Sequence, residues 1–228
     1  MGKKGKTVDR VYAEIKNMIY YNMLAPGQRI IYKDLAKRFG VSVTPVIQAL
    51  KLLERSNLVR YQTNRGYFVG ELTEQMVEDL YHVREALEVQ TLPLVLRNLD
   101  QEALDSIREA FKQYNQTRAP KPEGRVLMLR DAQFHLKIIE YSGNQAVYDI
   151  LKEVFEQIYL QYKSEYLLES RVGDAYQEHR AILKALGKGD LAEAAALLRD
   201  HIRHGKEHVL SIIRLEQEMF QHHKLEVG

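Results

Sequence analysis

Hydrophobic residues recur every three to four positions through the first third of the chain, and turn-forming residues divide this pattern into three segments. The periodicity predicts helices over residues 8–23, 33–39 and 45–56. Gly40 follows the second segment as a left-handed stop. Thr44 precedes a proline and is expected to be the N-cap of the third helix. Two short helices joined by a tight glycine turn are typical of a helix-turn-helix, whose second helix enters the DNA major groove.

A pair of β-prone runs follows the third predicted helix. Residues 58–61 and 67–69 are rich in aliphatic and aromatic side chains, and the segment 62–66 between them predicts a hairpin loop. Three helices followed by a hairpin make a winged helix, and the hairpin tip is expected to reach the adjacent minor groove. The apolar stripe that should hold the third helix against the second consists of Val46, Ala49, Leu50 and Leu53.

The rest of the chain shows helical periodicity and no strand pattern, which predicts an all-α bundle. The expected helices span residues 73–98, 100–117, 125–141, 145–166, 173–186 and 190–221. Pro93 should kink or interrupt the first of them, Gly187 should end the fifth, and residues 118–124 should form a loop. The inward row of the first bundle helix is expected to be Met76, Leu80, Val83, Leu87 and Thr91. We therefore predict a mainly α protein, with a winged helix-turn-helix domain at 1–72 and a helical domain at 73–228.

Composition narrows the class of protein. Hydrophobic residues make up 45% of the 228 residues, which is enough for a core. There is no apolar run of about 18 residues and no apolar segment after the basic start, so we expect neither a membrane span nor a signal peptide. The chain has no cysteine, which excludes disulfides and thiolate metal sites. These features predict a cytoplasmic protein with no membrane partner.

Charge is divided unevenly along the chain. Residues 1–70 contain 13 Lys and Arg against 4 Asp and Glu, whereas the remainder contains 20 against 27. A basic first third beside an acidic remainder indicates that the first third binds a polyanion, with a solvated basic face as the alternative. Together with the helix-turn-helix, the asymmetry favours DNA.

Four residues of the predicted bundle have side chains suited to metal binding. Asp131 and His135 are four positions apart and share one helix face, while His179 and His201 lie on two later helices. Three imidazoles and a carboxylate suit a divalent transition metal. The spacing alone is weak evidence, because helical histidines also occur on surfaces and in cores. A rival set, which lies on one helix and so cannot enclose an ion, consists of His201, His204 and His208.

Three stretches between Ala25 and Val69 resemble the N-terminal winged helix of the GntR family of bacterial transcription regulators. They read P-G-x-x-I, then D-L-A-x-x-F-G-V-S-x-T-P-V-x-x-A-L-x-x-L, then R-G-Y-F-V. The resemblance implies that a homodimer binds operator DNA, and the residues expected to contact DNA are Lys33, Ser42, Thr44, Gln48, Lys51, Arg65 and Gly66. The family usually has arginine where this chain has Val43 and Ile47, so operator preference should differ or direct DNA binding should be impaired. Ile31–Tyr32 also replaces the family's Ser-Glu pair, which removes the usual serine cap.

A second resemblance covers about residues 73–208. The segments D-A-Q-F-H-L-K-I-I-E-Y-S-G-N, E-H-R-A-I-L-K-A-L-G-K-G-D-L-A-E-A and L-L-R-D-H-I resemble the FCD ligand-binding domain of the FadR-like branch of that family. It implies a divalent transition metal, zinc ahead of nickel or manganese, bound by Asp131, His135, His179 and His201. It also implies a small carboxylate effector on the metal, with further contacts from Arg84, Arg130 and Asn144. The alternatives are a salt bridge from Arg84 to Glu85 or Glu88, and a helix cap at Asn144.

The sequence therefore predicts a homodimeric transcription regulator that responds to a metal and an effector, with repression as the family's usual sign. Two alternatives stay open. A metal-dependent hydrolase would use the same metal to activate water, although no separate general base is evident beside the four residues. A regulator with impaired direct DNA binding would act through a partner.

Overall fold

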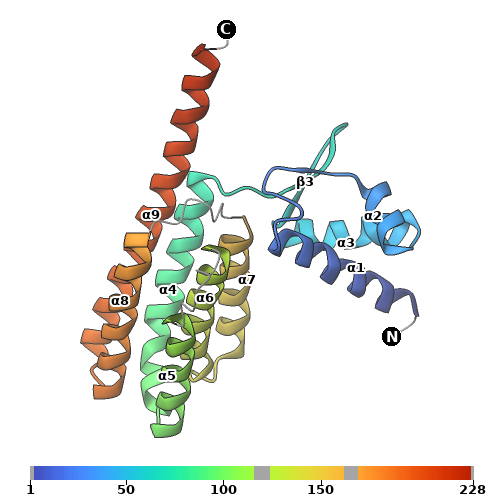
Figure 1. Cartoon of the computed structure of the whole chain (residues 1–228). Coiled ribbons are helices and arrows are strands. Elements are labelled where there is room, and N and C mark those ends of the chain that lie inside the picture. The colour runs from blue at the N-terminus through green and yellow to red at the C-terminus, as the bar shows by residue number, and fades with distance from the viewer. Residues whose placement is uncertain (1–2, 116–123, 162–168, 227–228) are drawn as a thin grey trace. The chain divides into compact units, whose positions relative to one another are not determined.

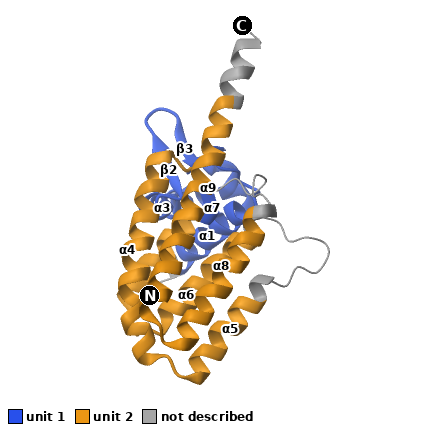
Figure 2. Ribbon diagram, turned by 90° about the vertical axis from the view of Figure 1, so that its left-hand side faces the viewer, with its two compact units in different colours: residues 1–71, 159–162 blue, residues 72–158, 163–228 orange. Residues whose placement is uncertain are grey.

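The computed structural model describes residues 3–115, 124–161 and 169–226. The chain divides into two compact units, which Figure 2 shows in two colours. The winged-helix unit comprises Met1–Glu71 and Tyr159–Tyr162, and the helical unit comprises Leu72–Ile158 and Lys163–Gly228. The domain limits predicted above, at residue 72, stay a prediction.

The winged-helix unit contains three helices and a small antiparallel sheet (Figure 1). Its elements are α1 (Lys3–Tyr20), β1 (Arg29–Ile30), α2 (Tyr32–Phe39), α3 (Val43–Arg55), β2 (Val59–Gln62) and β3 (Gly66–Val69). The strand order is β1-β3-β2, and Tyr61 pairs with Tyr67 across the hairpin. The predicted winged helix is confirmed, whereas the sequence analysis missed β1, which is too short to show an alternating pattern.

The core of this unit forms where α1 packs on α3. The burial of the predicted stripe on α3 is confirmed for all four residues, although α3 packs mainly on α1 and only in part on α2, which was the expected partner. The facing stripe on α1 consists of Val11, Ile15, Met18 and Ile19. Leu160, in the last turn of α7 (Gln145–Gln161), also belongs to this core and is only 1% exposed. Tyr159 packs against the same cluster. The N-terminal sequence therefore does not supply the whole core of its own unit.

The turn between α2 and α3 differs in part from the prediction. Gly40 is left-handed, with φ 64° and ψ 38°, as expected. Helix α3 begins two residues earlier than predicted, so Ser42 rather than Thr44 is the N-cap, and its side chain makes no capping hydrogen bond. Pro45 is then the third helical residue, which is tolerated because first-turn N–H groups have no intrahelical acceptor. Ile31 precedes α2 without a side-chain cap, as its apolar side chain predicts.

The helical unit contains six helices among its described residues and no strand among them (Figure 1). They are α4 (Glu74–Asn98), α5 (Gln101–Asn115), α6 (Gly124–Glu140), α7, α8 (Glu169–Lys188) and α9 (Leu191–Glu226). Three predicted starts are confirmed by side-chain oxygens that accept from a backbone N–H three residues later, at Thr73, Asp100 and Asp190. No described helix is long and apolar enough to cross a membrane.

Three details of the predicted helices differ in the structure. Pro93 lies inside α4 and does not interrupt it; its side chain is exposed, while the neighbouring Leu92 and Val95 are buried and hold the helix in place. A kink at Pro93 stays a prediction. Gly187 lies inside α8, which ends one residue later, before Gly189 in a left-handed conformation with φ 70°. Gly124 is already helical, and the rest of the predicted loop lies outside the described residues, as do the predicted helix ends at 116–117 and 162–166.

The inward face of α4 also differs from the prediction. Apart from Thr91, the predicted row is only partly buried, and Val83 is 37% exposed. The residues that α4 buries are Val77, Tyr81, Arg84, Glu88, Val89, Thr91, Leu92 and Val95. The apolar pattern pointed to the wrong face because two charged residues, Arg84 and Glu88, lie inward as an ion pair at 2.9 Å.

Candidate functional site

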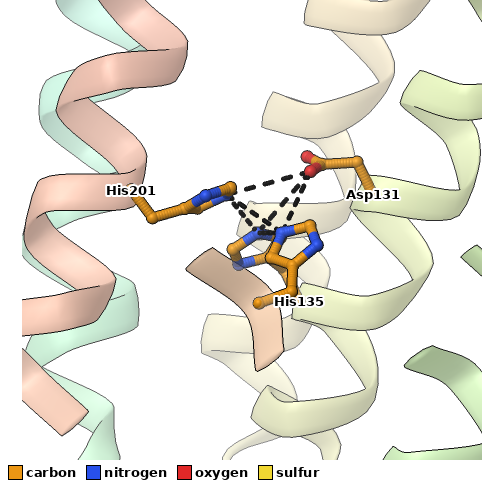
Figure 3. A group of neighbouring side chains, drawn as sticks. Asp131, His135 and His201 are labelled. Carbon is orange, nitrogen blue, oxygen red and sulfur yellow. Dashed lines mark hydrogen bonds and ion pairs between the residues drawn. The ribbon is translucent and has the colours of Figure 1, made fainter. Parts of the chain in front are cut away.

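Four side chains from three helices converge inside the helical unit. Asp131 and His135 extend from α6, His179 from α8 and His201 from α9; Figure 3 labels three of them. The three imidazoles are 0–3% exposed, and the Asp131 side chain is 25% exposed. One ligand atom from each residue lies within 4.8 Å of the others. The structure thus brings together the four predicted residues, although ligation of a metal by them stays a prediction.

The spacing of these atoms suits one small cation. The three Nε2 atoms are 3.0–3.3 Å apart, and Asp131 Oδ1 lies 3.2–4.0 Å from them. Four ligands at about 2.1 Å from a tetrahedral ion are roughly 3.4 Å apart. The observed separations bracket that value, so the residues fit a divalent transition metal.

Hydrogen bonds on the far side of two rings determine which nitrogen carries the proton. Nδ1 of His135 lies 2.7 Å from a Glu88 carboxylate oxygen, and Nδ1 of His201 lies 2.7 Å from Glu178. An ionised carboxylate only accepts, so each Nδ1 must donate its hydrogen. In the neutral rings, both Nε2 atoms then carry lone pairs, although they lie 3.0 Å apart. Two facing lone pairs repel each other unless a cation or a proton lies between them.

Burial and pairing set the charges of these groups. Burial alone would raise the pKa of Glu88, but its interactions with His135 and Arg84 lower it to about 2. The pKa of Glu178 is likewise lowered to about 2, against the effect of burial, by His201, Arg171 and His204. Burial, reinforced by the nearby His179, lowers the pKa of His201 to about 3. His201 is therefore neutral near neutral pH, with the ionised Glu178 at its Nδ1, and a neutral imidazole is the form of histidine that binds metal.

Arg84 lies beside this cluster and is only 3% exposed. Its Nε donates to Glu88 at 2.9 Å, and its guanidinium lies over the Phe155 ring at 4.3 Å and the Tyr81 ring at 5.1 Å. Its Nη2 is buried and has no hydrogen-bond partner among the described residues. Arg84 therefore forms the alternative salt bridge, with Glu88, while its Nη2 is available to a ligand.

The other two predicted effector contacts have different surroundings. Arg130 is partly exposed and adjoins Asp131 in α6. Asn144 is exposed at the start of α7, where its side-chain oxygen accepts from the Val147 N–H at 3.2 Å. The structure therefore shows the capping role of Asn144, and its contact with an effector stays a prediction.

The rival set of His201, His204 and His208 does not form a cluster that could hold an ion. Among the described residues, the cluster able to hold an ion includes His201 but neither of its two partners on α9. His204 is largely exposed, and its Nδ1 pairs with Glu178 at 2.8 Å.

The predicted DNA contacts lie on the outer face of the winged-helix unit. Lys33 on α2 is exposed, as are Ser42 at the N-cap of α3 and Thr44, Gln48 and Lys51 along that helix. Arg65 is exposed at the tip of the hairpin and stacks its guanidinium 5.4 Å from the Phe68 ring centre, and Gly66 begins β3 with φ 94°. These positions are accessible to DNA, but contact itself stays a prediction.

Sequence reasoning missed the two carboxylates that support the histidines. Glu88 follows Arg84 by one helical turn, and Glu178 directly precedes His179. The available signal was the spacing of polar residues on α4, where Arg84, Glu88 and Thr91 recur at four and three positions.

Two family models match the chain. The model described as bacterial regulatory proteins, gntR family, matches residues 7–69. The model of the FCD domain matches residues 79–204, more than half of the chain.

Relatives of similar length support the same assignment. The chain is 27% identical over 207 residues to the uncharacterized HTH-type transcriptional regulator YdhC of Bacillus subtilis, covering 91% of this chain and 92% of the relative. It is 25% identical over 183 residues to the gluconate operon transcriptional repressor of Bacillus subtilis, covering 79% and 72%. The structure of McbR from Escherichia coli has the same fold, with a TM-score of 0.73 at 20% identity, covering 95% of this chain and all of that one. These relatives are transcription regulators, which excludes the hydrolase alternative at the level of the family.

Proposed function

This chain belongs to the gntR family of bacterial regulatory proteins and carries an FCD domain, and we propose that a divalent metal and a small carboxylate effector control its binding to operator DNA. The family makes the protein a DNA-binding transcription regulator. The proposal concerns which metal and effector the protein senses and which residues bind them.

The metal half of the proposal rests mainly on the two facing lone pairs. His135 and His201 direct Nε2 atoms at each other at 3.0 Å while their Nδ1 atoms are committed to carboxylates. A cation bound between them would turn this repulsion into two coordinate bonds. Imidazole and carboxylate ligands in roughly tetrahedral spacing favour zinc, with nickel or manganese as the alternatives. Such an ion would supply an electrophilic position for an anionic ligand.

The effector half rests on the surroundings of the cluster. Asp131 is the one ligand candidate of the four with an appreciably exposed side chain, so a small molecule would approach from that side. The buried Nη2 of Arg84 has no acceptor among the residues that the structure describes, and a carboxylate would provide one with a charge-assisted hydrogen bond. A carboxylate of a few carbons that engages both the metal and Arg84 fits these two features.

Regulation requires that the effector bind the DNA-competent and DNA-incompetent states with different affinities. We propose a homodimer on a two-fold symmetric operator, because protein symmetry is mirrored in such DNA sites. The relative named as the repressor of a gluconate operon supports repression as the sign.

The first test is metal content. Protein purified without an affinity tag should contain about one transition metal per chain by mass spectrometry, and the His179→Ala variant should contain almost none. His82→Ala is the matched control, because His82 is exposed on α4 outside the four-residue cluster. Equal metal content in wild type and His179→Ala would refute the site, as would its absence from reloaded wild type.

The second test separates direct DNA binding from action through a partner. Fluorescence anisotropy with the DNA upstream of the gene should show tight binding that weakens steeply between 50 and 200 mM salt, as contacts from Lys33 and Lys51 to phosphates require. Binding without salt dependence, or none at all, would favour the impaired regulator. A verified effector that leaves operator affinity unchanged would refute the control mechanism alone.

A further inference from the structure

We propose that Glu88 is a positioning residue that links the metal site to the effector arginine, and that Glu178 is its counterpart on the other side of the cluster. This inference rests on the metal site proposed above. It assigns roles to carboxylates that are not themselves among the four ligand candidates.

Glu88 binds two functional groups at once. Its Oε2 accepts from His135 Nδ1 at 2.7 Å, and its Oε1 accepts from Arg84 Nε at 2.9 Å. All three side chains are buried, with exposures of 0–4%. Phe155 packs against both ends of this chain of contacts, 4.3 Å from the Arg84 guanidinium and with its centroid 5.7 Å from that of His135. The row Arg84–Glu88–His135 is therefore fixed by packing as well as by hydrogen bonds.

A second row of the same type supports His201. Glu178 Oε2 accepts from His201 Nδ1 at 2.7 Å and from Arg171 Nη1 at 2.9 Å, while its Oε1 accepts from the exposed His204 at 2.8 Å. This row is more accessible, because Glu178 is 21% and Arg171 13% exposed in their side chains. Two of the three histidines are thus oriented by a carboxylate that an arginine holds in turn.

The physical effect is to select one tautomer of each ring. A carboxylate at Nδ1 keeps the hydrogen there, which leaves the Nε2 lone pair directed at the ion position. Without it, the ring can place its hydrogen on Nε2 or rotate, and the ligand is lost. Removal of such an outer carboxylate typically weakens metal binding about 10- to 100-fold. We expect the larger effect at Glu88, since water can replace the acceptor more readily at the partly exposed Glu178.

Glu88 also positions the proposed effector contact, Arg84, whereas Glu178 does not. It holds Arg84 through Nε, while Nη2 of the same guanidinium has no hydrogen-bond partner among the described residues. The same carboxylate therefore orients a metal ligand and the proposed effector contact. Metal and effector binding should each favour the arrangement that the other needs, which is positive coupling between two sites.

The test compares Glu88→Gln with Glu85→Gln. Glutamine keeps the size of glutamate, and Glu85 is an adjacent outward residue on α4 that pairs with the exposed Arg203 at 2.8 Å. Zinc affinity is measured by competition with a chromophoric chelator, and the visible spectrum of the cobalt-loaded protein reports ligand geometry. We expect zinc affinity to fall 10- to 100-fold and the cobalt spectrum to change in Glu88→Gln, with neither effect in Glu85→Gln.

Three outcomes would overturn the inference or its basis. Folded Glu88→Gln with wild-type zinc affinity and an unchanged cobalt spectrum would overturn the positioning role and leave the metal site standing. Absence of zinc binding by wild type would overturn both. Should Glu88→Gln fail to fold by circular dichroism, Glu178→Gln on the more accessible row serves in its place, and a zinc affinity equal to that of wild type in this variant would overturn the shared mechanism.

Discussion

Leu160→Ala should destabilise the winged-helix unit, although position 160 is almost ninety residues beyond the end of the N-terminal segment of that unit. Leu160 is 1% exposed and lies in the core cluster formed by residues of α1, α3 and the sheet. Truncation to alanine removes three buried carbon atoms and leaves a cavity in a closely packed core. Substitutions of this kind cost about 3 to 5 kcal/mol.

That cost is large for a unit of this size. A domain of about 75 residues has a stability of roughly 4 to 11 kcal/mol, so a loss of about 3 kcal/mol removes a substantial share. The amide hydrogens of α1 and α3 should then exchange about 100-fold faster in native-state hydrogen exchange. Operator affinity should change little, because a unit that keeps about 1 to 8 kcal/mol of stability stays mostly folded.

Leu151→Ala is the matched control for this prediction. Leu151 lies on the same helix, is fully buried and belongs to the helical unit. Its truncation should accelerate exchange in the helical unit and leave α1 and α3 protected. If Leu160→Ala left exchange in α1 and α3 unchanged, the assignment of the last turn of α7 to the winged-helix core would be wrong.

Three further predictions address other parts of the chain. Gly70→Ala would place a Cβ atom 2.8 Å from the Asn57 carbonyl oxygen and 2.6 Å from Gln161 Oε1, so urea unfolding of the winged-helix unit should show a loss of about 1 to 3 kcal/mol. Zinc at about 100 times its dissociation constant should stabilise the helical unit by about 2.7 kcal/mol in a thermal or urea scan, and His179→Ala should abolish this gain. Ile47 is a partly exposed aliphatic residue between the exposed Thr44 and Lys51 on α3, so it should contact a thymine methyl group. Replacing operator thymines by deoxyuridine should weaken wild-type binding but not that of Ile47→Ala, and equal losses would refute this contact.

The winged helix could be predicted from sequence because its signals are local. Gly40 ends α2, and the stripe of four apolar residues on α3 faces the core as its spacing requires. The start of α3 was misplaced because Thr44-Pro45 has the composition of a cap, while the backbone had already turned helical at Val43. Leu160 could not have been assigned to this core from sequence, since nothing local in α7 distinguishes it from a residue of the bundle.

The candidate site could be predicted from sequence only in part. Its four ligand candidates came from family resemblance added to a weak spacing signal, and the structure brings them within 4.8 Å of one another. Glu88 and Glu178 were missed because the periodicity of a helix is interpreted with its apolar residues buried and its charged residues exposed. On α4 the predicted apolar row placed Val83 inside and did not include Glu88, whereas the structure has Val83 exposed and Glu88 buried.

The burial of charged residues on α4, where an apolar row was predicted, argues for a ligand-binding role of this helix. Burying Arg84, Glu88 and three imidazoles in one bundle costs desolvation energy that their ion pairs return only in part. Well-packed apolar residues at such positions often give a protein of equal or greater stability. Stability therefore does not explain a polar centre in which two imidazole Nε2 atoms face each other at 3.0 Å and one arginine nitrogen has no acceptor among the described residues. A cation would satisfy the first feature and an anion the second, so the bundle has the arrangement that the proposed metal and effector sites require.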